Sequence, residues 1–191
     1  MPGCAAGSRA ARGIVTRVET IQSASFESPI GTLRIASTSV GLAYLDLPRA
    51  GGRGFAGWLA GAIPGARRTE AFAPNRDAIR QVLEYLEGKR TDFDLRLDLR
   101  GTSFQRAVWD ALLAIPYGET RSYLDVARAV GKPDAVRAVG MANGANPVPL
   151  VVPCHRVIQS GGKIGGYGGG IDLKRRLLAM ERSVRHQGSL L

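Results

Sequence analysis

Three consecutive positions of this chain carry a thiol, an imidazole and a guanidinium: Cys154, His155 and Arg156. Pro153 stands before them, and residues 149–152 form an apolar, strand-like run. A lone buried cysteine is commonly a small apolar core residue, but an apolar strand gives no reason for a histidine and an arginine beside it. A thiol becomes a strong nucleophile when a base removes its proton. The stretch therefore indicates nucleophilic chemistry at Cys154.

His155 is the nearest candidate base for the thiol. Adjacent residues of a strand point to opposite faces, so Cys154 and His155 can share a network only if the chain turns, which Pro153 favours, or if a water bridges them. The imidazole then needs a carboxylate to hold its tautomer. Two acids follow the cysteine, Asp172 and Glu181. Spacing leaves both open, because Asp172 suits the N-cap of the last helix while Glu181 lies near that helix's apolar side, which is formed by Leu173, Leu177, Leu178 and Met180.

A glycine-rich segment, "SGGKIGGYGGGID", separates the cysteine from that helix. Glycines allow a ligand to approach the backbone closely and leave N–H donors accessible. Tyr167 lies in the middle of the segment, where an aromatic ring could form the wall of a pocket.

The whole chain has 191 residues and a net charge of +10, which favours a polyanionic partner, nucleic acid first. Its two cysteines, Cys4 and Cys154, do not form a disulfide framework, so we expect a reducing, cytoplasmic compartment. With two histidines and no CxxC or HxxxH spacing, the sequence predicts no zinc site, and nothing in it indicates a cofactor. It also has no apolar run of about 18 residues, so we predict no membrane span.

The pattern of elements divides the chain near Arg100. Residues 21–47 alternate like an antiparallel meander, with turns at Pro29 to Gly31 and near Gly41. A short helix over 55–62 and a longer one that Asn75 caps and Gly88 ends complete a small α/β domain, 21–100. Residues 1–20 are expected to be a flexible tail.

The second domain, 101–185, is predicted to be mostly helical and to be followed by a short tail, 186–191. Thr102 or Ser103 caps a helix with an apolar stripe that Pro116 and Gly118 stop. Two short helices, 122–130 and 134–143, flank a Gly-Lys-Pro turn. In a basic chain this arrangement indicates a helix-turn-helix.

These motifs together resemble the O6-alkylguanine-DNA alkyltransferases. The resemblance rests on "FQRAVWDALLAIPYGETRSY", "RAVGMANGANP", "VVPCHRVI", "GGYGGG" and "LLAME", and more loosely on "SPIGTLRIAST" and "DFDLRLDLRGT". It implies an α+β or α/β protein in which a small ribonuclease-H-like N-terminal domain precedes a winged-helix-like C-terminal domain. It also implies a monomer that binds the minor groove of double-stranded DNA containing O6-alkylguanine, and that acts as a DNA repair protein.

The resemblance also assigns roles to residues. Cys154 is the alkyl acceptor, His155 removes its proton through a water, and Glu181 stands behind His155. Asn146 braces the turn around the cysteine, and Tyr123 donates a proton to the guanine. In the groove, Arg137 replaces the flipped base, and the small residues Ala138, Gly140 and Ala142 allow the helix to approach the DNA closely. The pocket is lined by Val157, Tyr167 and Gly168. Gly168 stands where relatives often have serine, so only a backbone donor remains there.

The implied reaction is a methylated-DNA–protein-cysteine S-methyl transfer that consumes the protein. The Cys154 thiolate displaces guanine from the O6-alkyl carbon, with O4-alkylthymine as a second substrate, and Tyr123 protonates the leaving base. A non-catalytic lesion-binding protein is the alternative, but such proteins replace the acceptor cysteine. A Cys-His hydrolase would need no basic helix-turn-helix, and a plain helix-turn-helix regulator would leave Cys154 unexplained.

Overall fold

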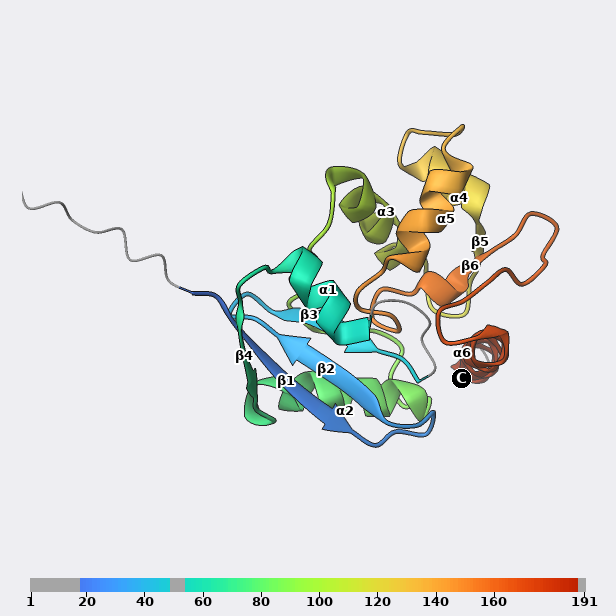
Figure 1. The fold of residues 1–191 in the computed structure, drawn as a ribbon. Helices are drawn as coiled ribbons and strands as arrows, with labels where there is room; N and C mark the ends of the chain where they lie inside the picture. Colours follow the sequence, from blue (N-terminus) through green and yellow to red (C-terminus); the bar gives the residue numbers. More distant parts are fainter. Residues whose placement is uncertain (1–17, 49–53, 189–191) are drawn as a thin grey trace, which may run out of the picture.

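The computed structural model describes residues 18–48 and 54–188, with side chains up to Val184. Its N-terminal part is a four-stranded sheet in the order β3-β2-β1-β4 (Figure 1). Strands β1 (Thr20–Phe26), β2 (Leu33–Ser37) and β3 (Leu42–Asp46) pair antiparallel, as the meander predicted. Strand β4 (Arg67–Glu70), which was not predicted, pairs parallel with β1.

Helices cover both faces of this sheet because its strands alternate apolar side chains between the faces. On one face, Ile35 and Leu45 join the main core with residues of α2 (Arg76–Leu86), which follows the short 3-10 turn η1 (Ala73–Asn75). On the other face, Ala36 and Tyr44 pack with Phe55 of α1 (Gly54–Ala62). Figure 1 shows α1 and α2 on opposite sides of the sheet.

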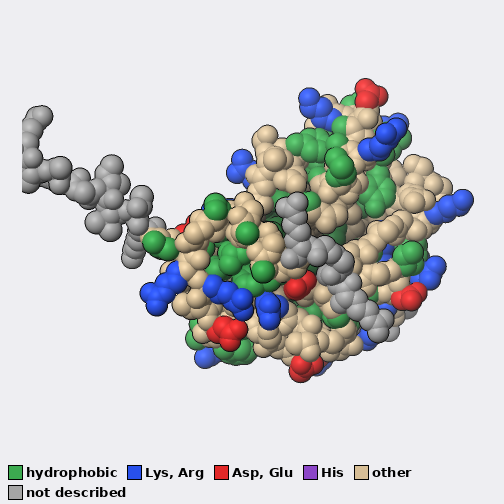
Figure 2. Space-filling view, viewed as in Figure 1, with side chains coloured by type: hydrophobic (Ala, Val, Ile, Leu, Met, Phe, Trp, Pro, Cys, Tyr) green, Lys and Arg blue, Asp and Glu red, His purple; other side chains and the backbone are tan. Residues whose placement is uncertain are grey.

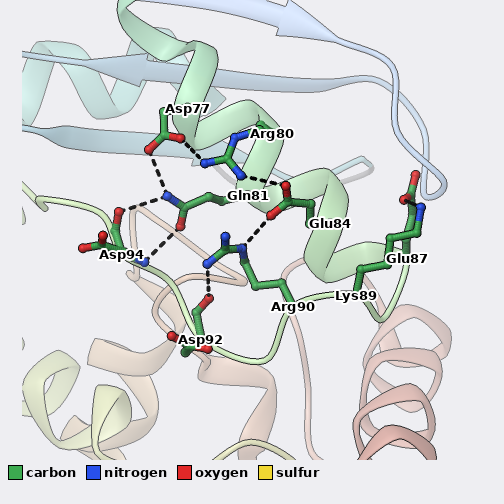
Figure 3. A network of polar contacts seen from close by, with 9 residues as sticks. All are labelled: Asp77, Arg80, Gln81, Glu84, Glu87, Lys89, Arg90, Asp92 and Asp94. Carbon is green, nitrogen blue, oxygen red and sulfur yellow. Dashed lines mark hydrogen bonds and ion pairs between the residues drawn. The ribbon is translucent and has the colours of Figure 1, made fainter.

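A polar network joins α2 to the segment that follows it (Figure 3). Gln81 Nε2 donates to the Asp94 carbonyl at 3.0 Å, and the Asp94 N–H donates to Gln81 Oε1 at 2.9 Å. Glu84 accepts from both Arg80 and Arg90, and Arg90 also reaches the Asp92 carbonyl. These contacts hold the segment after α2 against the helix and so fix the position of α2 in the domain.

The predicted N-cap of α2 is confirmed in position but not in its contacts. Asn75 stands at the N-cap, but its side chain makes no capping hydrogen bond. It instead accepts from Ser37 Oγ at 2.9 Å and donates to the carbonyls of Gln22 and Ala71, so it joins the helix to the sheet. The predicted end at Gly88 is confirmed, because Gly88 has a φ of +71° just after the helix.

The C-terminal part contains the predicted helices. Helix α3 (Ser103–Leu113) begins at a capping box in which Thr102 and Gln105 exchange hydrogen bonds. Helix α4 (Tyr123–Ala129) and helix α5 (Val136–Gly144) form the helix pair, and a further capping box, Ser122 with Asp125, starts α4. The last helix, α6 (Ile171–Gly188), begins before Asp172, so Asp172 lies in its first turn rather than at the predicted N-cap.

The predicted strand before the cysteine is wrong. Among residues 147–153 there is only an isolated bridge between Pro149 and Val152, and Leu150 has a φ of +74°. Proline lacks the N–H that a sheet ladder needs, and three prolines lie in this stretch. The chain instead turns into a 3-10 helix, η2 (Cys154–Arg156), followed by the two-residue strand β6 (Val157–Ile158), which pairs parallel with β5 (Arg121–Ser122).

The two parts of the chain share one hydrophobic core, which includes Tyr85 from the first part and Trp109 and Leu177 from the second. Their backbones also meet directly, since the Leu45 N–H donates to the Pro147 carbonyl at 2.8 Å. The predicted tail boundaries shift: Thr20 already belongs to β1, and α6 continues to Gly188. Residues 1–17, which include Cys4, and residues 189–191 lie outside the described residues. No helix in the described ranges is long and apolar enough to cross a membrane.

Candidate active site

Cys154 is the first residue of η2 and is only 5% exposed. Pro153 has a ψ of 62°, and the Cys154 N–H donates to the Val152 carbonyl at 2.8 Å, so the chain reverses at this point. Burial raises the pKa of the thiol to about 11, against the opposing effects of the Asn146 side chain, the Lys174 charge and nearby N–H groups. The resting cysteine is therefore a protonated thiol, and the site must remove a proton from it.

Two asparagines hold the turn, Asn143 near the end of α5 and Asn146 just after it. Asn146 donates to the Val152 carbonyl at 2.8 Å and accepts from the Val148 N–H at 3.0 Å. Asn143 donates to the Cys154 carbonyl at 3.4 Å. The cysteine loop is thereby tied to the second helix of the helix pair.

Glu181, on α6, is the carboxylate that meets His155, whereas Asp172 is exposed and pairs with Arg175. Glu181 Oε1 lies 3.0 Å from His155 Nε2, and both side chains are fully buried. Arg156 donates to both Glu181 oxygens and, at 2.6 Å, to the Ile115 carbonyl. The Gly118 N–H donates to Glu181 Oε2 at 3.0 Å.

These contacts keep the carboxylate ionised. Burial acts to raise the pKa of Glu181, but the hydrogen bonds from His155 and Arg156 outweigh it and lower that pKa to about 2. An ionised carboxylate only accepts, so His155 Nε2 carries the hydrogen and Nδ1 holds the free electron pair. Burial lowers the pKa of His155, although Glu181 opposes this, so the imidazole is neutral at pH 7. Its Nδ1 is buried and has no hydrogen-bond partner among the described residues.

Cys154 lines a cavity of about 1200 Å³ between the two parts of the chain. Tyr44 and Trp58 border it from the N-terminal side, and α3 and α5 border it from the other. Burial raises the pKa of Tyr123, and the nearby Cys154 raises it further, so its hydroxyl is protonated at neutral pH. Among the predicted site residues, the lining includes Tyr123, Gly140, Asn146, Cys154, Tyr167 and Gly168.

Two predicted positions do not fit their assigned places. Val157 is fully buried and does not line the cavity, and its carbonyl accepts from Lys174 Nζ at 2.6 Å. Ala142 is 2% exposed and belongs to the core, because its side of α5 packs on α3 and its carbonyl accepts from Trp109 Nε1. The Ala142 side chain therefore cannot contact a groove in this structure.

The outer face of α5 remains accessible. Arg137 and Met141, one turn apart, are exposed, and Ala138 is half-buried between them. Figure 2 shows Lys and Arg side chains at the end of the molecule that α4, α5 and their connecting loop form. The exposed basic residues of these elements include Arg128, Lys132 and Arg137.

Sequence reasoning missed three buried polar residues of this region. Tyr85 of α2 donates to Glu181 Oε1 at 2.6 Å. Lys174 is fully buried on α6, and its charge acts to lower the pKa of Cys154. Asn143 supports the cysteine turn. Lys174 and Asn143 lie in the quoted motifs or next to them, but no spacing signal could have linked Tyr85 to a site 70 residues away. The described residues hold no group of three His, Cys, Asp or Glu side chains that could bind a metal ion.

The chain matches two family models. Residues 21–99 match the ribonuclease-like domain of 6-O-methylguanine DNA methyltransferase, and residues 103–183 match its DNA binding domain. A methylated-DNA–protein-cysteine methyltransferase of Mycolicibacterium paratuberculosis is 47% identical over 90% of this chain and 97% of its own length. The corresponding protein of Methanosarcina barkeri is 45% identical over 82% of this chain and 94% of its own length.

A solved structure gives the same picture. The crystal structure of Mycobacterium tuberculosis OGT in complex with DNA is similar with a TM-score of 0.75 and 45% identity, covering 85% of this chain and 94% of that one. Fold and site thus define a two-domain DNA-repair protein with a buried cysteine at the edge of its cavity. The chain belongs to the 6-O-methylguanine DNA methyltransferase family. The comparisons confirm the predicted methyltransferase and do not support the non-catalytic alternative.

Proposed function

We propose that this protein removes alkyl groups from O6-alkylguanine, and from O4-alkylthymine, in double-stranded DNA and transfers them irreversibly to Cys154. The observation that carries this proposal is the placement of Cys154. Its thiol borders the large cavity, and the next residue, His155, is held by an ionised Glu181 with Nδ1 left as the basic nitrogen. No other described cysteine competes for the role.

The protein binds the minor groove through α5 and flips the damaged base into the cavity. Arg137 is exposed on α5 and its guanidinium fills the space that the base leaves, which offsets part of the few kcal/mol that flipping costs. Ala138 and Gly140 allow the helix to approach the groove closely. Ala142 supports α5 from the core instead of contacting DNA.

The chemistry is a displacement at the alkyl carbon. His155 Nδ1 takes the thiol proton through a water, the sulfur forms a bond to the alkyl carbon, and the bond from that carbon to O6 breaks. The electron pair goes to the guanine, which takes a proton from Tyr123. The products are a thioether and an ordinary guanine, and the proton lost from the thiol balances the one gained by the base. Because one cysteine is consumed, each chain acts once.

The pocket holds the base between Tyr167 and the backbone near Gly168, both of which border the cavity. The Val157 carbonyl accepts from Lys174 and does not border the cavity, so it takes no part in base recognition. Asn146 holds the cysteine turn in place through its two backbone contacts. The protein acts as a monomer in the cytoplasm, with its domains meeting near residue 100.

A Cys154→Ser variant tests the proposal. Serine keeps the shape of the site but is a far weaker nucleophile. We expect this variant to bind an O6-methylguanine duplex as tightly as the wild type and to leave the lesion intact, as measured by electrophoretic binding and by chromatography of the digested DNA. A Cys4→Ser variant is the matched control and should repair normally. Repair by Cys154→Ser would overturn the assignment of the acceptor.

A further inference from the structure

Tyr85 is fully buried in the last turn of α2 and belongs to the N-terminal domain, yet its hydroxyl meets the Glu181–His155 pair. The hydroxyl oxygen lies 2.6 Å from Glu181 Oε1 and 3.1 Å from His155 Nε2. With Nε2 itself 3.0 Å from Oε1, three polar atoms from three separate elements form a closed triangle.

The donor directions in this triangle follow from the charges. Glu181 is ionised and can only accept, so the Tyr85 O–H points to Oε1. Burial and the Glu181 charge raise the pKa of Tyr85 well above its ordinary value, so the hydroxyl keeps its proton. Its oxygen then presents lone pairs toward the His155 Nε2–H, which is shared between Oε1 and the tyrosine oxygen. Both contacts favour the tautomer with a free Nδ1.

We propose that Tyr85 is a positioning residue for alkyl transfer, through which the N-terminal domain fixes the orientation of Glu181 and of the catalytic histidine. The inference rests on the proposed roles of Cys154 and His155 and adds a contribution from outside the DNA-binding domain. Tyr85 touches neither the cavity nor Cys154, so it acts only through Glu181 and His155.

The surroundings of Tyr85 fit a fixed position. Its ring packs on Phe93 at 5.2 Å and edge-on against Tyr117 at 6.1 Å between ring centroids. The polar network of Figure 3 holds α2 one turn before Tyr85, where Gln81 and Asp94 exchange hydrogen bonds. The hydroxyl therefore approaches Glu181 from a rigid element.

Tyr85→Phe removes the hydroxyl and keeps the ring. Glu181 then loses a donor and attracts a proton on His155 more strongly, so the pKa of His155 rises. We expect the single-turnover rate of alkyl transfer to fall by about tenfold, the scale of losing a group that orients a site histidine. The acid limb of the pH–rate profile should move to higher pH, which a purely structural change would not cause.

Tyr117→Phe is the matched control. The Tyr117 hydroxyl is also buried near Glu181, but it has no hydrogen-bond partner among the described residues. Its removal should leave the rate and the pH profile of transfer unchanged. An equal effect of both substitutions would show that packing alone is involved and would overturn the inference, as would an unchanged Tyr85→Phe variant.

Nitrogen-15 NMR of the imidazoles separates this inference from the proposed reaction, because it needs no DNA and no turnover. The chain has two histidines, and a His186→Gln variant identifies the signals of His155. We expect the Nε2–H tautomer in all three proteins, because the ionised Glu181 fixes it. The pH at which His155 takes up its second ring proton should be higher in Tyr85→Phe than in the wild type and in Tyr117→Phe. An unchanged midpoint in Tyr85→Phe would overturn the positioning role even if alkyl transfer occurs as proposed.

Discussion

At the residue scale, the site is organised around one buried carboxylate. Glu181 accepts hydrogen bonds from Tyr85, His155, Arg156 and the Gly118 backbone. A buried ion that is paired and hydrogen-bonded is tolerated, whereas one that loses its partner is costly. The same interactions that leave His155 Nδ1 without a proton therefore also secure the last helix to the rest of the protein.

Glu181→Gln should lower the stability of the fold strongly. The substitution leaves Arg156, whose side chain is 8% exposed, as a buried charge without its carboxylate. We expect a loss of about 3 kcal/mol or more in the free energy of unfolding, measured by chemical denaturation. Asp172→Asn on the same helix changes an exposed acid and should stay within about 0.5 kcal/mol of the wild type. Equal small effects of both variants would contradict the account of the ion pair.

The pH dependence of transfer should follow His155. Because burial lowers its pKa below the ordinary 6.5, the imidazole is neutral at pH 7 and gains a proton only on acidification. We expect a rate that is flat from about pH 7 upward and falls below pH 6.5, measured by single-turnover kinetics. A rate that kept rising toward the thiol pKa of about 11 would show that Cys154 ionises without the histidine.

The sequence predicted part of this arrangement. Cys154 beside His155 indicated a nucleophile and a base, roles that stay predictions, and Glu181 was one of two carboxylates that could meet the histidine. The sequence could not decide between Asp172 and Glu181, because the choice depends on which side of α6 packs against η2. Tyr85 was beyond prediction, because it reaches the site only through the packing of α2 on the C-terminal domain.

At the element scale, α5 combines two duties. Its inner side, with Val139 and Ala142, belongs to the core, and its outer side presents Arg137 and Met141.

The prolines around residue 150 explain why a run of apolar β-formers forms a turn that brings Cys154 and His155 into one site. The strand β4, RRTE, was missed because its polar sequence carries no alternating apolar signal.

Arg137→Ala should separate groove binding from chemistry. Without the guanidinium, the gap left by the flipped base is unfilled, so we expect transfer from a duplex lesion to slow by about tenfold or more. Transfer from free O6-benzylguanine should be unchanged. Arg175→Ala removes an exposed arginine from α6 and controls for the loss of one positive charge. Equal losses with duplex and free base would remove the flipping role.

Gly41, just before β3, lies against the chain at Arg96, in the segment that leads to α3, and its substitution tests this contact. A Cβ at Gly41 would lie 2.2 Å from the Arg96 carbonyl oxygen, which also accepts from the Leu42 N–H at 2.8 Å. Gly41→Ala should therefore destabilise the protein by about 2 kcal/mol. Gly61→Ala on α1 has open space and should be neutral or slightly stabilising. Thermal unfolding measures both, and a tolerated Gly41→Ala would contradict the close contact.

At the scale of the whole molecule, the two domains form one body around a common core, with the cavity at their junction. The sequence predicted the domain types and a boundary near residue 100. It did not reveal that the N-terminal domain borders the cavity and contacts Glu181, since these contacts join residues far apart in the chain. The excess of positive charge, +10 overall, suits a DNA-binding protein.

Intact-protein mass spectrometry after mixing with a duplex that carries one O6-methylguanine shows whether Cys154 accepts the methyl group. We expect a mass gain of one methylene that saturates at one per chain, maps to the peptide containing Cys154, persists in Cys4→Ser and is absent in Cys154→Ser. A duplex that is bound but produces no mass gain, or a gain at another residue, would contradict transfer to Cys154.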